Sequence, residues 1–73
     1  MLIDPGHGGK DPGTHHNGIR EKDLTLDISK RVGAILSSRG LNVRYTRRSD
    51  TWITLEQRAD KVRTNKADLF ISI

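Results

Sequence analysis

Cysteine is absent from this chain of 73 residues, which excludes disulfides and every metal site built on thiolates. A chain of this length buries only about 60% of the surface that its unfolded form exposes. Small domains therefore usually need a disulfide, a metal or close association with another chain. Without cysteine, any metal would have to be held by histidine and carboxylate side chains.

Long apolar runs and aromatic side chains are also scarce. No apolar run approaches 18 residues, so we expect no membrane span. No signal-peptide pattern is visible, and for an exported protein we expect the signal to lie outside these residues. The only aromatic residues are Tyr45, Trp52 and Phe70, which provide no array on which nucleic-acid bases could stack.

The net charge is +4, and the excess is local. Residues 39–66 hold eight basic and three acidic residues, whereas the first 21 hold two basic and three acidic. Such a stretch is typical of a solvated helix face, although a surface for nucleic acid or another anionic polymer is also consistent with it. Nucleic-acid binding would show a steep salt dependence. Because aromatic residues are so few, we do not expect a nucleic-acid partner.

The order of predicted elements is β-α-β-α-β. Residues 1–3 read as the end of a buried strand, and residues 4–20 as a loop with five glycines and two prolines. Apolar residues at helical spacing predict a helix from about Lys22 to a stop at Gly40. They are Leu24, Ile28, Val32, Ile35 and Leu36. Gly33 inside this helix indicates close packing at that position.

The second half repeats the strand and helix pattern. Residues 41–46 alternate and are rich in strand formers. Thr54-Leu55-Glu56-Gln57 is a capping box, so a second helix should begin near Leu55. We expect its buried stripe to contain Leu55, Ala59 and Val62. Residues 68–73 are predicted to form a strand apolar enough to be covered on both faces.

This order predicts an α/β fold with parallel strands, right-handed crossovers and helices on both faces of the sheet. The last predicted strand runs to Ile73 with no turn or helix after it. We therefore expect residues 1–73 to be a portion of a larger sheet and of a domain that is incomplete at its C-terminus. An open sheet edge invites pairing with another chain, so self-association through that edge is also expected.

The glycine-rich loop places one histidine at a functional edge of the sheet. Ligands of open parallel sheets bind beyond the carboxyl ends of the strands. His7 lies four residues after Ile3, and Glu21 lies at the start of the first helix, which opens at the same edge. The loop between them can bring imidazole and carboxylate together, because its glycines turn without steric cost.

Four interpretations compete for this loop. A phosphate cradle would need G-K-[ST] or G-x-G-x-x-G, and neither occurs. A serine nucleophile is disfavoured because the loop contains no serine. A purely structural loop with an incidental histidine is the third interpretation. The fourth is a metal site in which His7 and Glu21 are two of three protein ligands, as in catalytic zinc sites.

Several motifs together resemble one enzyme family. They are I-D-P-G-H-G-G-K-D-P-G at 3–13, R-E-K-D at 20–23, Y-T-R at 45–47, L-E-Q-R at 55–58, Asn65, and A-D-L-F-I-S-I at 67–73. In this order and spacing they resemble the zinc-dependent N-acetylmuramoyl-L-alanine amidases of bacterial cell walls, of the amidase_3 type. The resemblance extends over essentially the whole chain, and the α/β fold of that family agrees with the predicted element order.

The resemblance implies that His7 and Glu21 bind Zn²⁺, and that the substrate is peptidoglycan outside the cytoplasm, in the periplasm, cell wall or medium. In the family, the third ligand is a histidine directly after S-I, and a catalytic glutamate comes much later. Neither falls within residues 1–73, so we expect no catalytic residue in this chain and an inactive fragment. His15 and His16 match no family ligand and are expected to be exposed. The alternative is a non-catalytic cell-wall binding or regulatory module of the same fold.

Overall fold

The computed structural model describes all of residues 1–73. In chain order, its elements are β1 Leu2–Asp4, β2 His15–His16, β3 Ile19–Arg20, α1 Glu21–Ser38, β4 Arg44–Tyr45, α2 Leu55–Thr64 and β5 Phe70–Ser72. The predicted β-α-β-α-β order is confirmed, with one additional short hairpin, β2-β3, inside the first loop.

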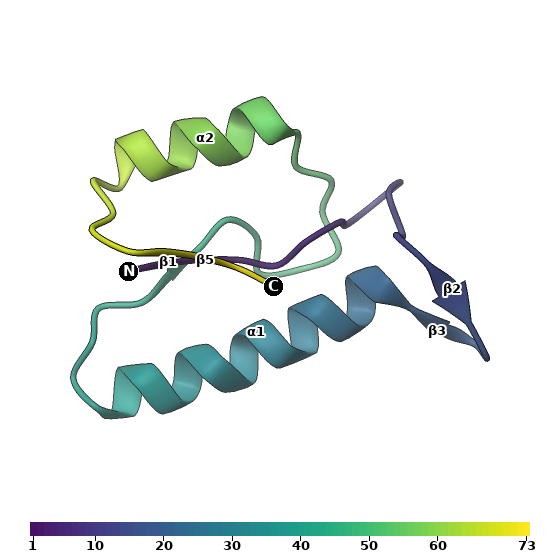
Figure 1. Cartoon of the computed structure of the whole chain (residues 1–73), viewed down its shortest axis with the longest axis horizontal. Coiled ribbons are helices and arrows are strands. Elements are labelled where there is room, and N and C mark those ends of the chain that lie inside the picture. Colours follow the sequence, from purple (N-terminus) through teal and green to yellow (C-terminus); the bar gives the residue numbers. More distant parts are fainter.

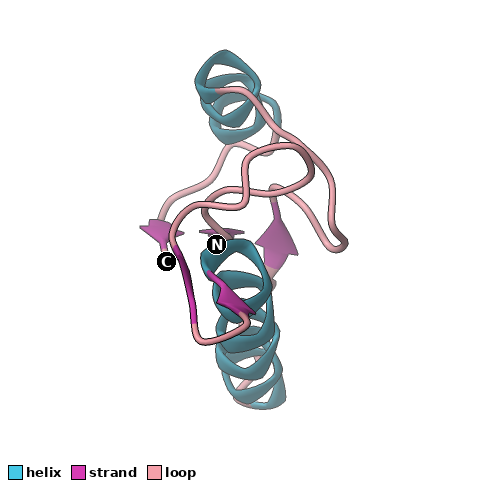
Figure 2. Ribbon diagram, turned by 90° about the vertical axis from the view of Figure 1, so that its right-hand side faces the viewer, coloured by secondary structure: helices cyan, strands magenta, loops and turns pink.

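Three strands form a parallel sheet in the order β4-β1-β5. The connection from β1 to β4 and the connection from β4 to β5 therefore run in opposite directions along the sheet. Since parallel crossovers are right-handed, opposite directions place the two helices on opposite faces. Figures 1 and 2 show this arrangement, with the sheet lying between α1 and α2. The predicted fold class is thus confirmed. Neither helix combines the length and apolar character needed to cross a membrane.

Helix α1 is anchored by close contact at Gly33. A Cβ atom at this position would lie 2.7 Å from Tyr45 Cζ in β4 and still nearer to the tyrosine hydroxyl. The close packing predicted from Gly33 is therefore confirmed. The helix ends as expected, with Gly40 at a φ of 90° that favours glycine.

The face that α1 turns to the sheet differs from its apolar stripe. The buried residues are Lys22, Thr25, Ser29 and Gly33. Leu24, Ile28 and Ile35 predicted the helix correctly by their spacing, yet all three are exposed. Small residues face the sheet because the helix approaches it closely, as the contact at Gly33 shows.

Helix α2 begins where its capping box predicts. The Thr54 hydroxyl accepts a hydrogen bond from the Gln57 backbone N–H, and the Gln57 side chain accepts one from the Thr54 N–H. The predicted buried stripe is wrong, however. Leu55 is 85% exposed, and the one buried residue of α2 is Arg58. Arg58 forms an ion pair with the buried carboxylate of Asp4, so the side of α2 that carries Arg58 faces inward and the side that carries Leu55 faces outward.

The outer strands are shorter than predicted. β4 contains only residues 44–45 of the expected 41–46, and β5 only residues 70–72 of the expected 68–73. The expectation that the last strand is covered on both faces is wrong, since Phe70 is 40% exposed. β5 is an edge strand of the sheet and pairs only with β1.

The histidine loop contains a hairpin that the prediction missed. β2 and β3 pair antiparallel around Asn17 and Gly18, which both have positive φ angles, 52° and 79°. Asn-Gly is the strongest short-range signal for such a turn, so the sequence did carry this information. His15 and His16 are exposed as expected, but they lie in a strand of this hairpin.

The interior is mainly polar. Leu2 and Ile3 are the only hydrophobic side chains that are fully buried. The buried polar residues are Asp4, Lys22, Thr25, Ser29, Thr46, Arg47 and Arg58. Only Ser29 Oγ among the buried side-chain N and O atoms has no hydrogen-bond partner. The centre of this chain is therefore held mainly by a connected polar network.

The contact at Gly33 makes a testable prediction. Gly33→Ala should destabilise the protein by about 1–3 kcal/mol through overpacking, although alanine favours helix over glycine. Urea unfolding followed by circular dichroism measures this change. Tyr45→Phe in the same background should recover part of the loss because it removes the hydroxyl nearest the new methyl group. A stabilising Gly33→Ala substitution would contradict the contact.

Candidate metal centre

His7 lies just beyond the carboxyl end of β1, on the side of the sheet where the strands end, as predicted from the sequence. Its backbone φ is 60°, a left-handed conformation that non-glycine residues rarely adopt. Arg58 of α2 donates a hydrogen bond to the His7 carbonyl at 2.9 Å. The histidine is thus presented by a strained turn that a side chain from another element supports.

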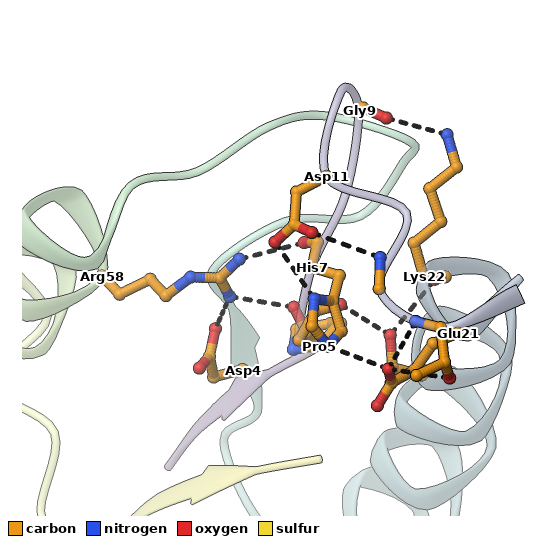
Figure 3. Close-up of polar contacts among 12 residues, drawn as sticks. Asp4, Pro5, His7, Gly9, Asp11, Glu21, Lys22 and Arg58 are labelled. Carbon is orange, nitrogen blue, oxygen red and sulfur yellow. Dashed lines mark hydrogen bonds and ion pairs between the residues drawn. The ribbon is translucent and has the colours of Figure 1, made fainter.

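Glu21 is the first residue of α1 and faces His7. The His7 Nε2 atom lies 3.2 Å from Glu21 Oε1 (Figure 3). The same carboxylate oxygen accepts hydrogen bonds from the backbone N–H and the hydroxyl of Thr14, at 3.0 and 3.2 Å. The structure therefore brings together the two side chains that the sequence singled out. Whether they bind a metal stays a prediction.

Asp11 completes the surroundings of the imidazole and was not identified from the sequence. Its carboxylate lies 3.0 Å from His7 Nδ1. The hydrogen bond from His7, with a second from the Gly13 N–H, keeps the pKa of Asp11 below its usual value. An ionised carboxylate only accepts hydrogen bonds, so Nδ1 must carry the proton. The signal in the sequence was an acidic residue four positions after the histidine.

This proton assignment has a consequence for the space between His7 and Glu21. The hydrogen bond from the Thr14 backbone N–H is the largest cause that lowers the pKa of Glu21, so its carboxylate is also ionised at neutral pH. When the imidazole is neutral with its proton on Nδ1, Nε2 and Glu21 Oε1 turn lone pairs toward the same point. Two atoms that turn lone pairs toward each other repel unless a cation or a proton lies between them.

The geometry fits a zinc ion at that point. Two donors held at about 2.0–2.2 Å by one tetrahedral zinc ion lie roughly 3.3–3.6 Å apart, close to the observed 3.2 Å. Gly13 also closes over the pair, since a Cβ there would lie 2.6 Å from Glu21 Oε1 and 2.8 Å from His7 Cδ2. A carboxylate on the distal nitrogen of a ligating histidine is the usual outer-shell arrangement.

The pair supplies two donors. No group of three or more His, Cys, Asp or Glu side chains in the chain is arranged to hold a metal ion. His15 and His16 make no hydrogen bond or ion pair with either residue. A cavity of about 620 Å³ opens beside His7 and Asp11, with Trp52 and Arg58 among its lining residues. Residues 1–73 thus offer two donors to a metal at this point.

A second set of polar contacts fixes the glycine turn after His7. It joins Lys22 and Asp50 to Gly9, and we call it the Asp50 bracket. Lys22, which is buried, donates to the Gly9 carbonyl at 2.9 Å and to Asp50 at 2.8 Å. Asp50 in turn accepts a hydrogen bond from the Gly9 N–H at 2.7 Å. These bonds keep the pKa of Asp50 below its usual value, Lys22 being the larger cause. The loop after β4 therefore holds the histidine loop in place.

Comparison with known proteins identifies the family. The Amidase_3 family model, described as N-acetylmuramoyl-L-alanine amidase, matches residues 1–73. The chain belongs to the Amidase_3 family. Over its whole length it is 51% identical to the endolysin of Bacillus phage SPP1, and 44% identical to the N-acetylmuramoyl-L-alanine amidase LytC of Bacillus subtilis strain 168.

A solved amidase structure confirms the fold. The N-acetylmuramoyl-L-alanine amidase of Clostridium difficile 630 superposes on 97% of this chain with a TM-score of 0.92 and 40% sequence identity. The chain corresponds to 40% of that structure, and to 27% and 15% of the SPP1 endolysin and LytC. It thus spans well under half the length of these relatives.

The Asp50 bracket predicts a pH-dependent contribution to stability. Because its folded pKa is lowered, Asp50 stabilises the fold above its unfolded pKa of about 4 and loses this effect as the pH falls. Asp50→Asn should therefore lower the melting temperature at pH 7, and the difference from the wild type should shrink as the pH falls below about 4. Thermal unfolding by circular dichroism at several pH values measures this difference.

Asp60→Asn serves as the control. Asp60 pairs only with Arg63 on the exposed side of α2, where ion pairs contribute little. An equal loss of stability from Asp50→Asn at every pH would contradict the bracket.

Proposed function

We propose that this chain forms the N-terminal portion of the catalytic domain of a zinc-dependent N-acetylmuramoyl-L-alanine amidase. The reaction is hydrolysis of the amide bond between N-acetylmuramic acid and the L-alanine of the peptidoglycan stem peptide. The observation that carries the proposal is the pair of His7 Nε2 and Glu21 Oε1, 3.2 Å apart, in a chain of the Amidase_3 family. The named activities of LytC and the Clostridium difficile protein support it.

The residues of this chain have defined roles in the proposal. Nε2 of His7 and Oε1 of Glu21 would hold Zn²⁺, and Asp11 would keep the imidazole proton on Nδ1 so that Nε2 stays free. Thr14 orients the Glu21 carboxylate through two hydrogen bonds to one oxygen. Zinc bound there supplies a Lewis acid for the substrate carbonyl and a water whose pKa falls to roughly 7.

The cavity beside the pair offers room for a substrate. It is bounded by the histidine loop on one side and by residues 52–56 on the other. His7 and Asp11 form part of its wall, so a substrate placed in the cavity would lie against the imidazole that we propose as a ligand. Peptidoglycan lies outside the cytoplasmic membrane, and we propose an extracytoplasmic location for the protein.

Self-association is part of the proposal. β5 is an open edge of the sheet; its first residue, Phe70, is 40% exposed, and the preceding Leu69 is 51% exposed. Exposed edge strands pair readily with other chains. We expect the isolated 73 residues to associate through this edge.

Zinc binding tests the proposed ligands. The 73-residue chain should bind Zn²⁺, and His7→Ala or Glu21→Ala should weaken binding at least tenfold because either change leaves one donor. Isothermal titration at pH 7 measures the affinity.

His15→Ala is the matched control because it removes an exposed histidine of the same loop that has no contact with the pair. It should leave the affinity unchanged. If His15→Ala weakens zinc binding as much as His7→Ala does, the proposed ligands are wrong.

Cleavage of peptidoglycan tests the function itself. The 73 residues alone should release no soluble muropeptides from purified sacculi, because they provide two donors and no group of three. Loss of a general base alone typically lowers a rate by about 10²- to 10⁴-fold. Extension along the family sequence, through the histidine after S-I and the late glutamate, should restore release that a chelator abolishes.

In the extended protein, His7→Ala should abolish release, whereas Lys10→Ala should have a smaller effect. Lys10 lies in the same loop, where it stacks on Trp52 at 3.9 Å from the ring centre. Full activity of the His7→Ala variant would refute the metal interpretation of this loop.

A further inference from the structure

Three successive carbonyl groups of the histidine loop turn toward two buried arginines. Arg58 donates to the carbonyls of Pro5 and His7, both at 2.9 Å. Arg47 donates to the carbonyls of Pro5 and Gly6, at 3.2 and 2.8 Å. Both arginines are more than nine-tenths buried, Arg47 in the segment after β4 and Arg58 in α2. The path of the chain from β1 to the proposed ligand is therefore fixed by guanidinium groups.

Arg58 makes the contact closest to the imidazole. Its guanidinium also forms an ion pair with Asp4, the last residue of β1 (Figure 3). One planar guanidinium group thus contacts the Asp4 side chain at the end of β1, the Pro5 carbonyl and the His7 carbonyl. Only arginine offers several donors in a rigid fork that reaches three acceptors together.

The conformation of His7 explains why such a fork is needed. Its φ of 60° is left-handed, and a residue with a side chain holds this conformation only when its surroundings impose it. The neighbouring glycines adopt positive φ angles freely, so the loop without a clamp would have many alternatives. The Arg58 hydrogen bond acts on the carbonyl of the strained residue itself.

We propose that Arg58 is a positioning residue for the metal centre: its hydrogen bonds to the Pro5 and His7 carbonyls hold His7 in the left-handed conformation that turns Nε2 toward Glu21. The metal-affinity part of this inference rests on the proposed function. The conformational part concerns the zinc-free chain and stands independently.

A simpler role for Arg58 would be to neutralise the buried Asp4 carboxylate. Asp4 also accepts hydrogen bonds from Thr46 at 2.7 Å and Ser72 at 3.1 Å. Asparagine at position 4 would keep an acceptor for these hydroxyls without a charge. The double substitution Asp4→Asn/Arg58→Met therefore removes the need for neutralisation together with the carbonyl clamp.

The experiment compares Arg58→Lys, Arg58→Met and Asp4→Asn/Arg58→Met with the wild-type chain. Zinc affinity is measured by isothermal titration and stability by thermal unfolding. The φ angle of His7 is followed in the zinc-free chain through its backbone HN–Hα coupling and carbonyl chemical shift. Arg63→Met is the matched control, since Arg63 lies on the same helix, is exposed and pairs only with Asp60.

We expect Arg58→Lys to stay folded, because lysine can still pair with Asp4, and to lose about 10- to 100-fold in zinc affinity. Its His7 coupling and shift should move away from the left-handed values. The double variant should regain stability relative to Arg58→Met but not zinc affinity. Arg63→Met should change none of these quantities.

Wild-type zinc affinity and an unchanged His7 coupling in the double variant would overturn the proposal and leave Arg58 with charge neutralisation alone. If Arg58→Met does not fold, Arg58→Lys tests the proposal through the same two measurements, the zinc affinity and the His7 coupling. If the wild-type chain binds no zinc, the proposed metal site fails, while the His7 coupling in the zinc-free variants still decides the role of Arg58.

Discussion

The buried ion pair between Asp4 and Arg58 is the interaction on which the rest of the structure depends. It joins the end of β1, the central strand, to α2 on one face of the sheet. The same guanidinium donates hydrogen bonds to two carbonyls of the histidine loop. A buried carboxylate without its partner is strongly destabilising. The pair therefore fixes which side of α2 faces inward, and it explains why an arginine is buried there while Leu55 is exposed.

The same principle of polar anchoring extends to the other side of the loop. Arg47 is buried against loop carbonyls and the start of α1, and burial lowers its pKa, with the nearby charge of Arg58 as a further cause. Lys22 and Asp50 hold the next turn. With Leu2 and Ile3 as its only fully buried hydrophobic side chains, this part of the molecule depends on hydrogen-bond geometry. Such networks are costly when incomplete, but when satisfied they specify a single arrangement.

That single arrangement matters for the proposed chemistry. A metal ligand has to be held within a fraction of an ångström of its working position, and loops do this poorly unless their backbone is supported. Glu21 is placed by a helix, which is rigid. His7 is placed by a glycine-rich turn, and it acquires comparable order from Arg58, from Asp11 on its ring and from the close approach of Gly13.

Residue patterns alone predicted the element order, the start of α2 at its capping box, the close packing at Gly33 and the meeting of His7 with Glu21. Caps and turns depend on neighbouring residues, an interior glycine marks a close approach, and the carboxyl ends of parallel strands share one edge of the sheet, so residue patterns carry this information. The buried faces of the two helices and the contacts that hold the loop depend instead on residues far apart in the chain. The partners of Arg58 lie 51 to 54 positions away in the chain, and no local periodicity encodes a contact at that separation.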